Sequence, residues 1–111
     1  MWICLNDAFL SAVQHARKPS FLVVRARNPE HLEMLFPKSK VSVTEGSDYA
    51  ARVVISKKKF AAFLVEEVGR ITYPNFKDSV KDQDLHDAYL RMWVNHKNYQ
   101  TLIEKEKPDV P

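Results

Sequence analysis

The sequence predicts a single α+β domain built on a ferredoxin-like antiparallel sheet, with helices packed on one face. Two patterns lead to this expectation. Short segments alternate apolar and polar side chains between turn residues, as half-buried strands do, and longer segments repeat apolar side chains every three or four residues, as amphipathic helices do. The chain has 111 residues, 45% of them hydrophobic, which suffices for one core. We expect the domain to cover residues 1–104 and the charged tail 105–111, with its two prolines, to fray.

The N-terminal part of the chain is predicted to form three strands. Met1–Leu5 and Phe9–Gln14 flank an Asn6-Asp7 turn, so the two are expected to pair as a hairpin. Phe21–Arg27 (FLVVRAR) is the clearest strand of the chain, because its side chains divide cleanly between two faces.

The middle of the chain is predicted to contain one short helix and two further strands. The helix covers Pro29–Phe36, and Asn28 stands where a side chain can cap it. The strands cover Lys40–Thr44 and Tyr49–Ile55, with a Gly-containing turn between them. One face of the second strand is expected to carry Tyr49, Ala51, Val53 and Ile55.

Two helices are predicted to complete the chain, which gives the order β-β-β-α-β-β-α-α. Ser56 is expected to cap the first, Lys57–Arg70, and the second covers Gln83–Glu104. The first has an apolar stripe at helical spacing, formed by Phe60, Leu64, Val68 and Ile71. The β-α-β-β-α part in the middle of this order is typical of a ferredoxin-like sheet.

Charge and cysteine content restrict the class of protein only loosely. The formal net charge is +3, which permits an anionic partner without requiring one. Cys4 is the single cysteine, so it is interpreted as a small buried apolar residue, and a reducing compartment is favoured. No apolar segment is long enough to span a bilayer, and the N-terminus lacks the pattern of a signal peptide. The expectation is a cytoplasmic protein with no membrane partner.

Arginines on neighbouring strands form the first candidate site. Arg25 and Arg27 share one strand face, and Arg52 joins them if its strand presents the same side. Guanidinium groups bind phosphate in bidentate fashion, so such a face, with Phe21 nearby, could hold nucleic acid. Alternatively, the arginines keep an exposed sheet soluble and pair with acidic neighbours. Three lysines at the start of the Lys57–Arg70 helix allow the same two interpretations, a site that binds an anion or a solvated surface.

The second candidate site lies within Ile71–Trp93. Its unexplained polar residues are Tyr73, Asn75, Lys77 and His86, which we expect to meet Asp48 and Arg52 if the protein has a site. A histidine near tyrosine and aspartate can move protons, but the same groups also form buried polar networks. No P-loop, nucleophile elbow or metal-ligand spacing of histidines is present. No cofactor or metal is therefore expected, and His86 is the only candidate catalytic residue.

Several segments, quoted as they stand, resemble the motifs of a family of small bacterial and phage proteins of about this length. They are MW at the start, FLVVRAR, GSDYAAR, ITYPNFKDSV and HDAYLRMW. The resemblance covers most of Met1–Trp93, departs where Ala50-Ala51 replaces an expected aromatic residue, and leaves Val94–Pro111 as an extension. It implies no activity and no cofactor. The matching positions are Arg25, Arg27, Asp48, Tyr49, Arg52, Tyr73, Asn75, Phe76, Lys77, His86, Tyr89 and Trp93.

Three functional hypotheses follow. The first is a non-enzymatic protein that binds nucleic acid or a nucleic-acid-handling protein complex; a phage or mobile-element inhibitor of host defence, of the anti-CRISPR type, is one form of it. The second is an enzyme acting on phosphate esters, in which the arginines hold the phosphate and His86 moves protons with Tyr73 and Asp48. The third is a self-associating protein, a homodimer joined through the exposed hairpin edge of Met1–Gln14.

Overall fold

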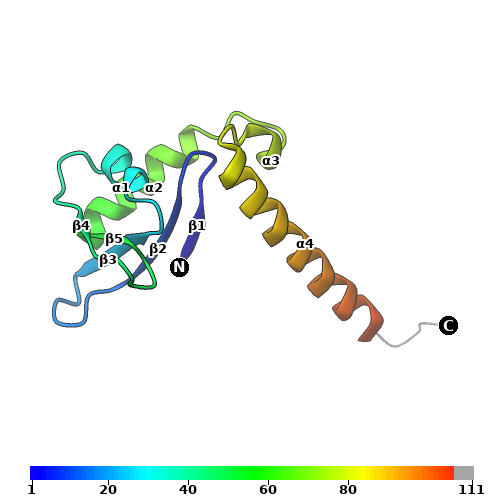
Figure 1. Cartoon of the computed structure of the whole chain (residues 1–111), viewed down its shortest axis with the longest axis horizontal. Helices are drawn as coiled ribbons and strands as arrows, with labels where there is room; N and C mark the ends of the chain where they lie inside the picture. The colour runs from blue at the N-terminus through cyan, green and yellow to red at the C-terminus, as the bar shows by residue number, and fades with distance from the viewer. Residues whose placement is uncertain (107–111) are drawn as a thin grey trace.

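The computed structural model describes residues 1–106 and has an α+β architecture with one five-stranded antiparallel sheet (Figure 1). The strand order across the sheet is β1-β2-β3-β5-β4. The predicted α+β class and the N-terminal hairpin are both confirmed. The strands are β1 (Trp2–Cys4), β2 (Phe9–Gln14), β3 (Phe21–Ala26), β4 (Ser42–Val43) and β5 (Ala51–Ser56).

The hydrophobic core lies between one face of the sheet and two helices, α1 (Pro29–Leu35) and α2 (Lys57–Gly69). On the sheet, Val24 of β3 stands opposite Val53 of β5, and both are buried. From the helices, Leu32 and Phe60 pack against this face. The complete buried cluster is Leu10, Ala12, Val24, Ala26, Leu32, Phe36, Ala51, Val53, Ile55 and Phe60.

Both core helices begin at the residues that the sequence predicts. The Asn28 side chain accepts a hydrogen bond from the backbone of Glu30 at 3.1 Å, and Ser56 accepts one from Lys59 at 3.1 Å. Each cap satisfies an amide that the first helical turn leaves unpaired. The predicted stripe of α2 is wrong at its C-terminal end, because Val68 and Ile71 are exposed there and only its first half reaches the core.

The C-terminal part of the chain differs from the expectation in two respects. A short helix, α3 (Phe76–Ser79), lies between the two predicted helices, and the Asn75 side chain caps it by accepting a hydrogen bond from the Asp78 amide at 3.1 Å. Helix α4 covers Gln83–Glu106, so the first two residues of the predicted tail are helical. The remainder of that tail, residues 107–111, lies outside the described residues.

The expectation that all helices cover one face is wrong, because α4 reaches the opposite face. Leu10 points into the core, so its neighbour Phe9 points to the other side of the sheet. The Phe9 ring meets the Tyr89 ring of α4 edge-on, with centroids 6.4 Å apart. The segment through α3 leads the chain around the end of the β1–β2 hairpin, which brings the start of α4 to this second face (Figure 1).

The ferredoxin-like arrangement is present only in outline. Strands β3, β5 and β4 with helices α1 and α2 follow the predicted β-α-β-β-α order. A ferredoxin-like sheet then adds a strand after its second helix. Here the described chain continues as α3 and α4, and β2, from the N-terminal hairpin, lies beside β3 instead.

The second half of α4 projects away from the rest of the molecule (Figure 1). The extents are 58 × 33 × 33 Å and the radius of gyration is 17.0 Å, compared with roughly 13 Å for a compact chain of this length. Large apolar side chains are exposed along this projecting part, among them Tyr99, Leu102 and Ile103. None of the helices in the described part of the chain combines the length and apolar character needed to cross a bilayer.

Candidate functional site

Two arginines stand directly opposite each other on the sheet face that α1 and α2 leave open. Arg25 of β3 and Arg52 of β5 are register partners, which confirms that they share a face. Arg25 donates a hydrogen bond to the Ser11 hydroxyl on β2 at 2.9 Å. Within residues 1–106 neither arginine forms an ion pair, and the Nε atom of each is buried without a hydrogen-bond partner. Like charges opposite each other destabilise a sheet, so this pair is suited to an added anion.

Tyr49 connects these arginines to Arg27. The Cζ atoms of Arg25 and Arg27 lie 4.4 Å and 4.3 Å from the centre of the Tyr49 ring, so the ring lies between two guanidinium groups. The prediction that Tyr49 shares the core face with Ala51 is wrong, since β5 begins only at Ala51 and Tyr49 belongs to the preceding turn. Its ring is nevertheless buried, against the arginines of the open face.

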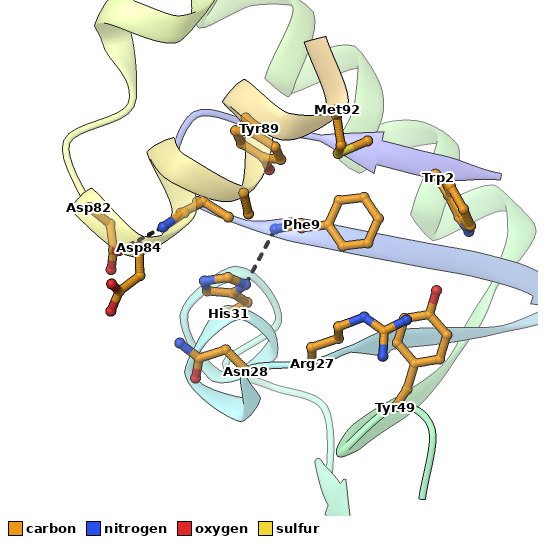
Figure 2. Close-up of a pocket in the computed structure, with 12 residues that line it drawn as sticks. Trp2, Phe9, Arg27, Asn28, His31, Tyr49, Asp82, Asp84, Tyr89 and Met92 are labelled. Atoms are coloured by element: carbon orange, nitrogen blue, oxygen red, sulfur yellow. Dashed lines mark hydrogen bonds between the residues drawn. The ribbon is translucent and has the colours of Figure 1, made fainter. Parts of the chain in front are cut away.

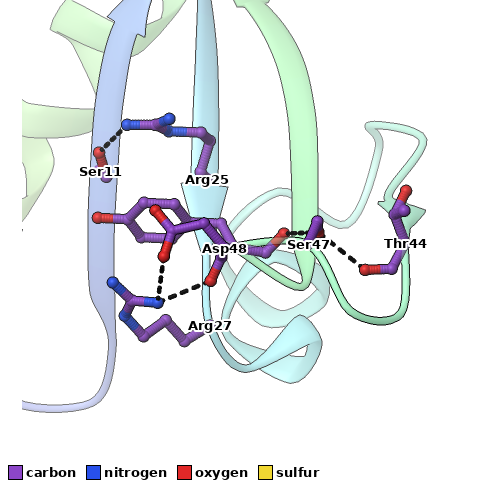
Figure 3. A network of polar contacts seen from close by, with 7 residues as sticks. Ser11, Arg25, Arg27, Thr44, Ser47 and Asp48 are labelled. Carbon is purple, nitrogen blue, oxygen red and sulfur yellow. Dashed lines mark hydrogen bonds and ion pairs between the residues drawn. The ribbon is translucent and has the colours of Figure 1, made fainter.

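The turn before Tyr49 is held by its own polar contacts (Figure 3). Arg27 donates to the backbone oxygen of Asp48 at 2.7 Å and pairs with its carboxylate at 3.3 Å. The Ser47 hydroxyl lies 2.8 Å from the Thr44 carbonyl oxygen. Gly46 has a φ of 79°, a left-handed conformation that favours glycine. Arg27 thus has an acidic partner, whereas Arg25 and Arg52 have none among the described residues.

The rest of the open face is more apolar than a solvated sheet surface. Val13, Val23 and Val54 form a row across β2, β3 and β5, and Val54 is 49% exposed. At the end of this face, the Lys18 ammonium lies 5.6 Å from the centre of the Phe21 ring. A face that combines β-branched side chains, an aromatic ring and unpaired guanidinium groups can contact both the apolar and the anionic parts of a partner.

The polar residues between Tyr73 and His86 have structural partners of their own. Tyr73 packs edge-on against Phe76, with centroids 5.8 Å apart, and Asn75 caps α3. The Lys77 ammonium lies 4.2 Å from the centre of the Trp93 ring. His86 Nδ1 lies 3.5 Å from the carboxylate of Asp87, its neighbour in the chain. Most of this second candidate set therefore stabilises the junction of α3 and α4.

The eight candidate residues thus form two separate groups. Arg25, Arg27, Asp48 and Arg52 lie together around Tyr49, as the contacts above show. The pocket that Arg27 lines contains none of the candidates Tyr73, Asn75, Lys77 and His86.

Two titratable groups beside the β1–β2 turn have raised pKa values. Burial raises the pKa of the Tyr89 hydroxyl above its usual value, with smaller contributions from Cys4 and Asp7. This hydroxyl lies 2.9 Å from the Leu5 carbonyl oxygen and 2.8 Å from that of Ala8. Cys4 is exposed, so its interpretation as a buried apolar residue is wrong. Partial desolvation raises the pKa of its thiol, the opposite of what an activated nucleophile needs.

A pocket of about 520 Å³ lies where the open sheet face meets the starts of α1 and α4. Sequence reasoning identified Arg27 as a candidate but missed the other residues that line it. They come from four separate segments of the chain, so no local pattern could have revealed them. Its polar lining residues include His31, Asp82 and Asp84, and its aromatic ones are Trp2, Phe9, Tyr49 and Tyr89.

Charge is strongly segregated along the chain, a signal that sequence reasoning could have used. Segments 8–29 and 49–65 contain eight of the 17 lysines and arginines and none of the 14 acidic residues. These segments supply β2, β3, β5 and the first part of α2. The rest of the chain holds nine basic residues and all 14 acidic ones, so a chain with a modest net charge has a markedly basic sheet.

Within residues 1–106, no group of three or more His, Cys, Asp or Glu side chains is arranged to hold a metal ion. Comparison with known proteins finds no matching family model, no matching curated protein and no matching solved structure.

Proposed function

We propose that this chain is a non-enzymatic binding protein that holds nucleic acid against a ferredoxin-like sheet, on the face that α1 and α2 leave open. The observation that carries this proposal is the absence of acidic residues from segments 8–29 and 49–65, which supply the three central strands. A local excess of positive charge on one surface attracts the phosphate backbone whatever the net charge of the chain.

The arginine pair gives this attraction a specific place. Arg25 and Arg52 face each other across two strands, and the buried Nε atom of each lacks a partner among the described residues. A phosphate between the two guanidinium groups would accept hydrogen bonds from both and would remove their mutual repulsion. Further basic side chains continue the path toward the β2–β3 turn, where the Lys57 amide donates to the Ser20 carbonyl oxygen at 2.9 Å. They are Arg17, Lys18, Lys57, Lys58 and Lys59.

The alternative of a phosphate-ester enzyme has weaker support. It needs His86 and the arginines in one cleft, and His86 does not line the pocket that contains Arg27. The nearest carboxylate to the His86 ring is that of Asp87, at 3.5 Å. A binding role requires only the arginines and their surroundings, so we favour it.

Fluorescence anisotropy with labelled 20-nucleotide single strands and duplexes tests the proposal. Affinity is expected to fall roughly 30-fold between 50 and 200 mM salt if three phosphates are contacted. Arg52→Gln is the most informative variant, because Arg52 forms no side-chain hydrogen bond within residues 1–106, so the fold should tolerate the change. It is expected to lower the slope of log affinity against log salt by about 0.7–0.9.

Arg91→Gln is the matched control, since Arg91 is an exposed residue of α4, outside the sheet. It removes the same charge and is expected to leave the slope nearly unchanged. No binding of either strand type at 50 mM salt, or equal losses for Arg52→Gln and Arg91→Gln, would overturn the proposal.

Self-association is a second candidate function, favoured by the projecting half of α4. Within this half, positions 96, 99 and 103 repeat at spacings of three and four residues, which places them on one side of the helix. Every charged residue between positions 90 and 105 lies off this side. The hairpin edge is a less suitable interface, because β1 has only three residues. Light scattering at high concentration decides the matter: a strictly monomeric protein would exclude a homodimer through either surface.

A further inference from the structure

The pocket beside the arginines has the character of a ligand site. Its volume of about 520 Å³ lies within the range of about 300–1,000 Å³ that small-molecule sites occupy. Trp2 and Phe9 come from the β1–β2 hairpin, Tyr49 from the turn before β5, and Tyr89 from α4 (Figure 2). Such a mainly apolar cavity, with a few polar groups at one end, suits a flat aromatic ligand.

The aromatic walls are held in place by one another and by the backbone. The Phe9 ring packs edge-on against Trp2 at 6.2 Å and against Tyr89 at 6.4 Å between centroids. Tyr89 is fixed by its hydroxyl contacts with the β1–β2 turn, and Tyr49 by its two arginines. The walls are therefore preformed, which lowers the entropic cost of inserting a ring between them.

The polar end of the pocket is rich in hydrogen-bond acceptors. Asp82 and Asp84 line it from the start of α4, and His31 lines it from α1 (Figure 2). Asp82 already accepts the Leu85 amide at 3.0 Å. The carboxylate of Asp84 has no hydrogen bond or ion pair with any other described residue. His31 Nδ1 accepts the Phe9 amide at 3.3 Å, so a neutral His31 ring carries its proton on Nε2.

The pocket and the arginine pair are adjacent. Tyr49 and Arg27 line the pocket, and the other side of the Tyr49 ring contacts Arg25. A nucleotide whose phosphate lies at Arg25 and Arg52 therefore has an aromatic cavity beside it for its base. Enzymes and binding proteins that read single bases use the same combination of stacking and hydrogen bonds to the Watson–Crick edge.

We infer that this pocket receives one unpaired base of the bound nucleic acid and that Asp84 makes it selective for guanine. The inference rests on the proposed function and goes one step beyond it. The Watson–Crick edge of guanine presents two neighbouring donors, N1–H and N2–H, that one carboxylate accepts together. Adenine and cytosine each place a ring acceptor beside their amino group, which a carboxylate repels. Uracil and thymine offer a single N–H between two carbonyl oxygens.

Tryptophan fluorescence provides a direct test. Trp93→Phe leaves Trp2 as the only tryptophan, and Trp93 is half-exposed and outside the pocket, so this background should fold normally. In the Trp93→Phe protein, GMP is expected to quench the fluorescence of Trp2 at lower concentrations than AMP, CMP or UMP do. Asp84→Asn should weaken GMP binding by roughly 5- to 150-fold, the range for loss of a bidentate base contact. Asp78→Asn, at an exposed aspartate outside this pocket, is the matched control and should have no effect.

A variant that fills the pocket provides a second, independent test of the inference. Ala88 lines the pocket from an exposed position of α4, so Ala88→Leu should fill part of the cavity without altering charge and with little loss of helix propensity. It is expected to abolish the GMP-dependent quenching. Equal quenching by all four nucleotides, or no effect of Asp84→Asn and Ala88→Leu, would refute the inference.

The outcomes for the pocket and for the sheet are separable. Oligo(dT) lacks guanine, so its salt-dependent binding reports on the basic sheet face without the guanine contact. If oligo(dT) binds and Arg52→Gln weakens it, but guanine is not preferred, the proposed function survives and the pocket inference fails. If no oligonucleotide binds, the proposed function fails, and this inference fails with it, whatever GMP does.

Discussion

The Tyr89 hydroxyl is the contact through which α4 is fixed to the β1–β2 turn, and Tyr89→Phe removes it without changing the ring. The ring is only 4% exposed, and the hydroxyl lies within 2.9 Å of two carbonyl oxygens. The Ala8 oxygen keeps the Leu5 amide as a donor, whereas the Leu5 oxygen has no other donor among the described residues. Tyr89→Phe therefore removes a buried hydrogen bond and leaves one carbonyl oxygen without a donor. This should lower the free energy of unfolding by about 1–2 kcal/mol at pH 7.

The raised pKa of Tyr89 predicts how this loss depends on pH. Its ordinary pKa is 10.0, and burial raises the value in the folded state. The folded protein therefore holds this proton more tightly than the unfolded chain does. The stabilisation is complete below pH 10 and declines as pH rises above it, by about 1.4 kcal/mol at pH 11. The phenylalanine variant lacks this titration, so the difference between the two proteins should shrink toward zero at pH 11.

Urea denaturation followed by circular dichroism measures both quantities. Tyr99→Phe is the matched control, because Tyr99 is 62% exposed and its hydroxyl has no partner within residues 1–106. The control should stay within about 0.5 kcal/mol of the wild type. An unchanged stability of Tyr89→Phe at pH 7, or a difference that persists undiminished at pH 11, would refute this reasoning.

Two further predictions concern the core and the start of α2, and both are measured by the same denaturation assay. Leu32→Ala should lower the free energy of unfolding by about 2–5 kcal/mol, because Leu32 is completely buried. Val65→Ala, at a position 72% exposed, should lower it by less than about 0.5 kcal/mol. Similar losses at both sites would show that Leu32 is not part of the core. Ser56→Ala removes the acceptor for the Lys59 amide and should cost about 1 kcal/mol, with Ser56→Asp restoring most of it; a neutral Ser56→Ala would show that this cap is dispensable.

The sequence patterns predict those elements whose two faces differ strongly in polarity. Phe9–Gln14 forms a strand with the expected bounds, and the α1 and α2 caps are where polar side chains precede apolar stripes. The strand predicted for Tyr49–Ile55 begins too early, because alternating side chains do not show at which residue strand pairing begins. The Tyr49 ring is instead positioned by Arg25 and Arg27 on either side of it. These contacts form only when β3 and the turn before β5 come together in the fold.

The candidate site could be predicted only where its residues share a strand register. Arg25 and Arg52 could be placed on one face from alternation, and the pairing of β3 with β5 brings them together. The pocket could not be predicted in this way. Its walls depend on α4 passing to the open face, which follows from the path of the chain through α3 rather than from any periodic pattern.

The projecting half of α4 also sets how far the end of the helix lies from the sheet. The helix continues for 17 residues beyond Tyr89, whose hydroxyl contacts the β1–β2 turn, to Glu106. At about 1.5 Å per residue this is a reach of roughly 26 Å. Contacts made at its far end do not overlap with the arginines of the open face, so occupation of one need not displace the other. A partner bound at that end would therefore be held at a set distance and direction from one bound on the open face.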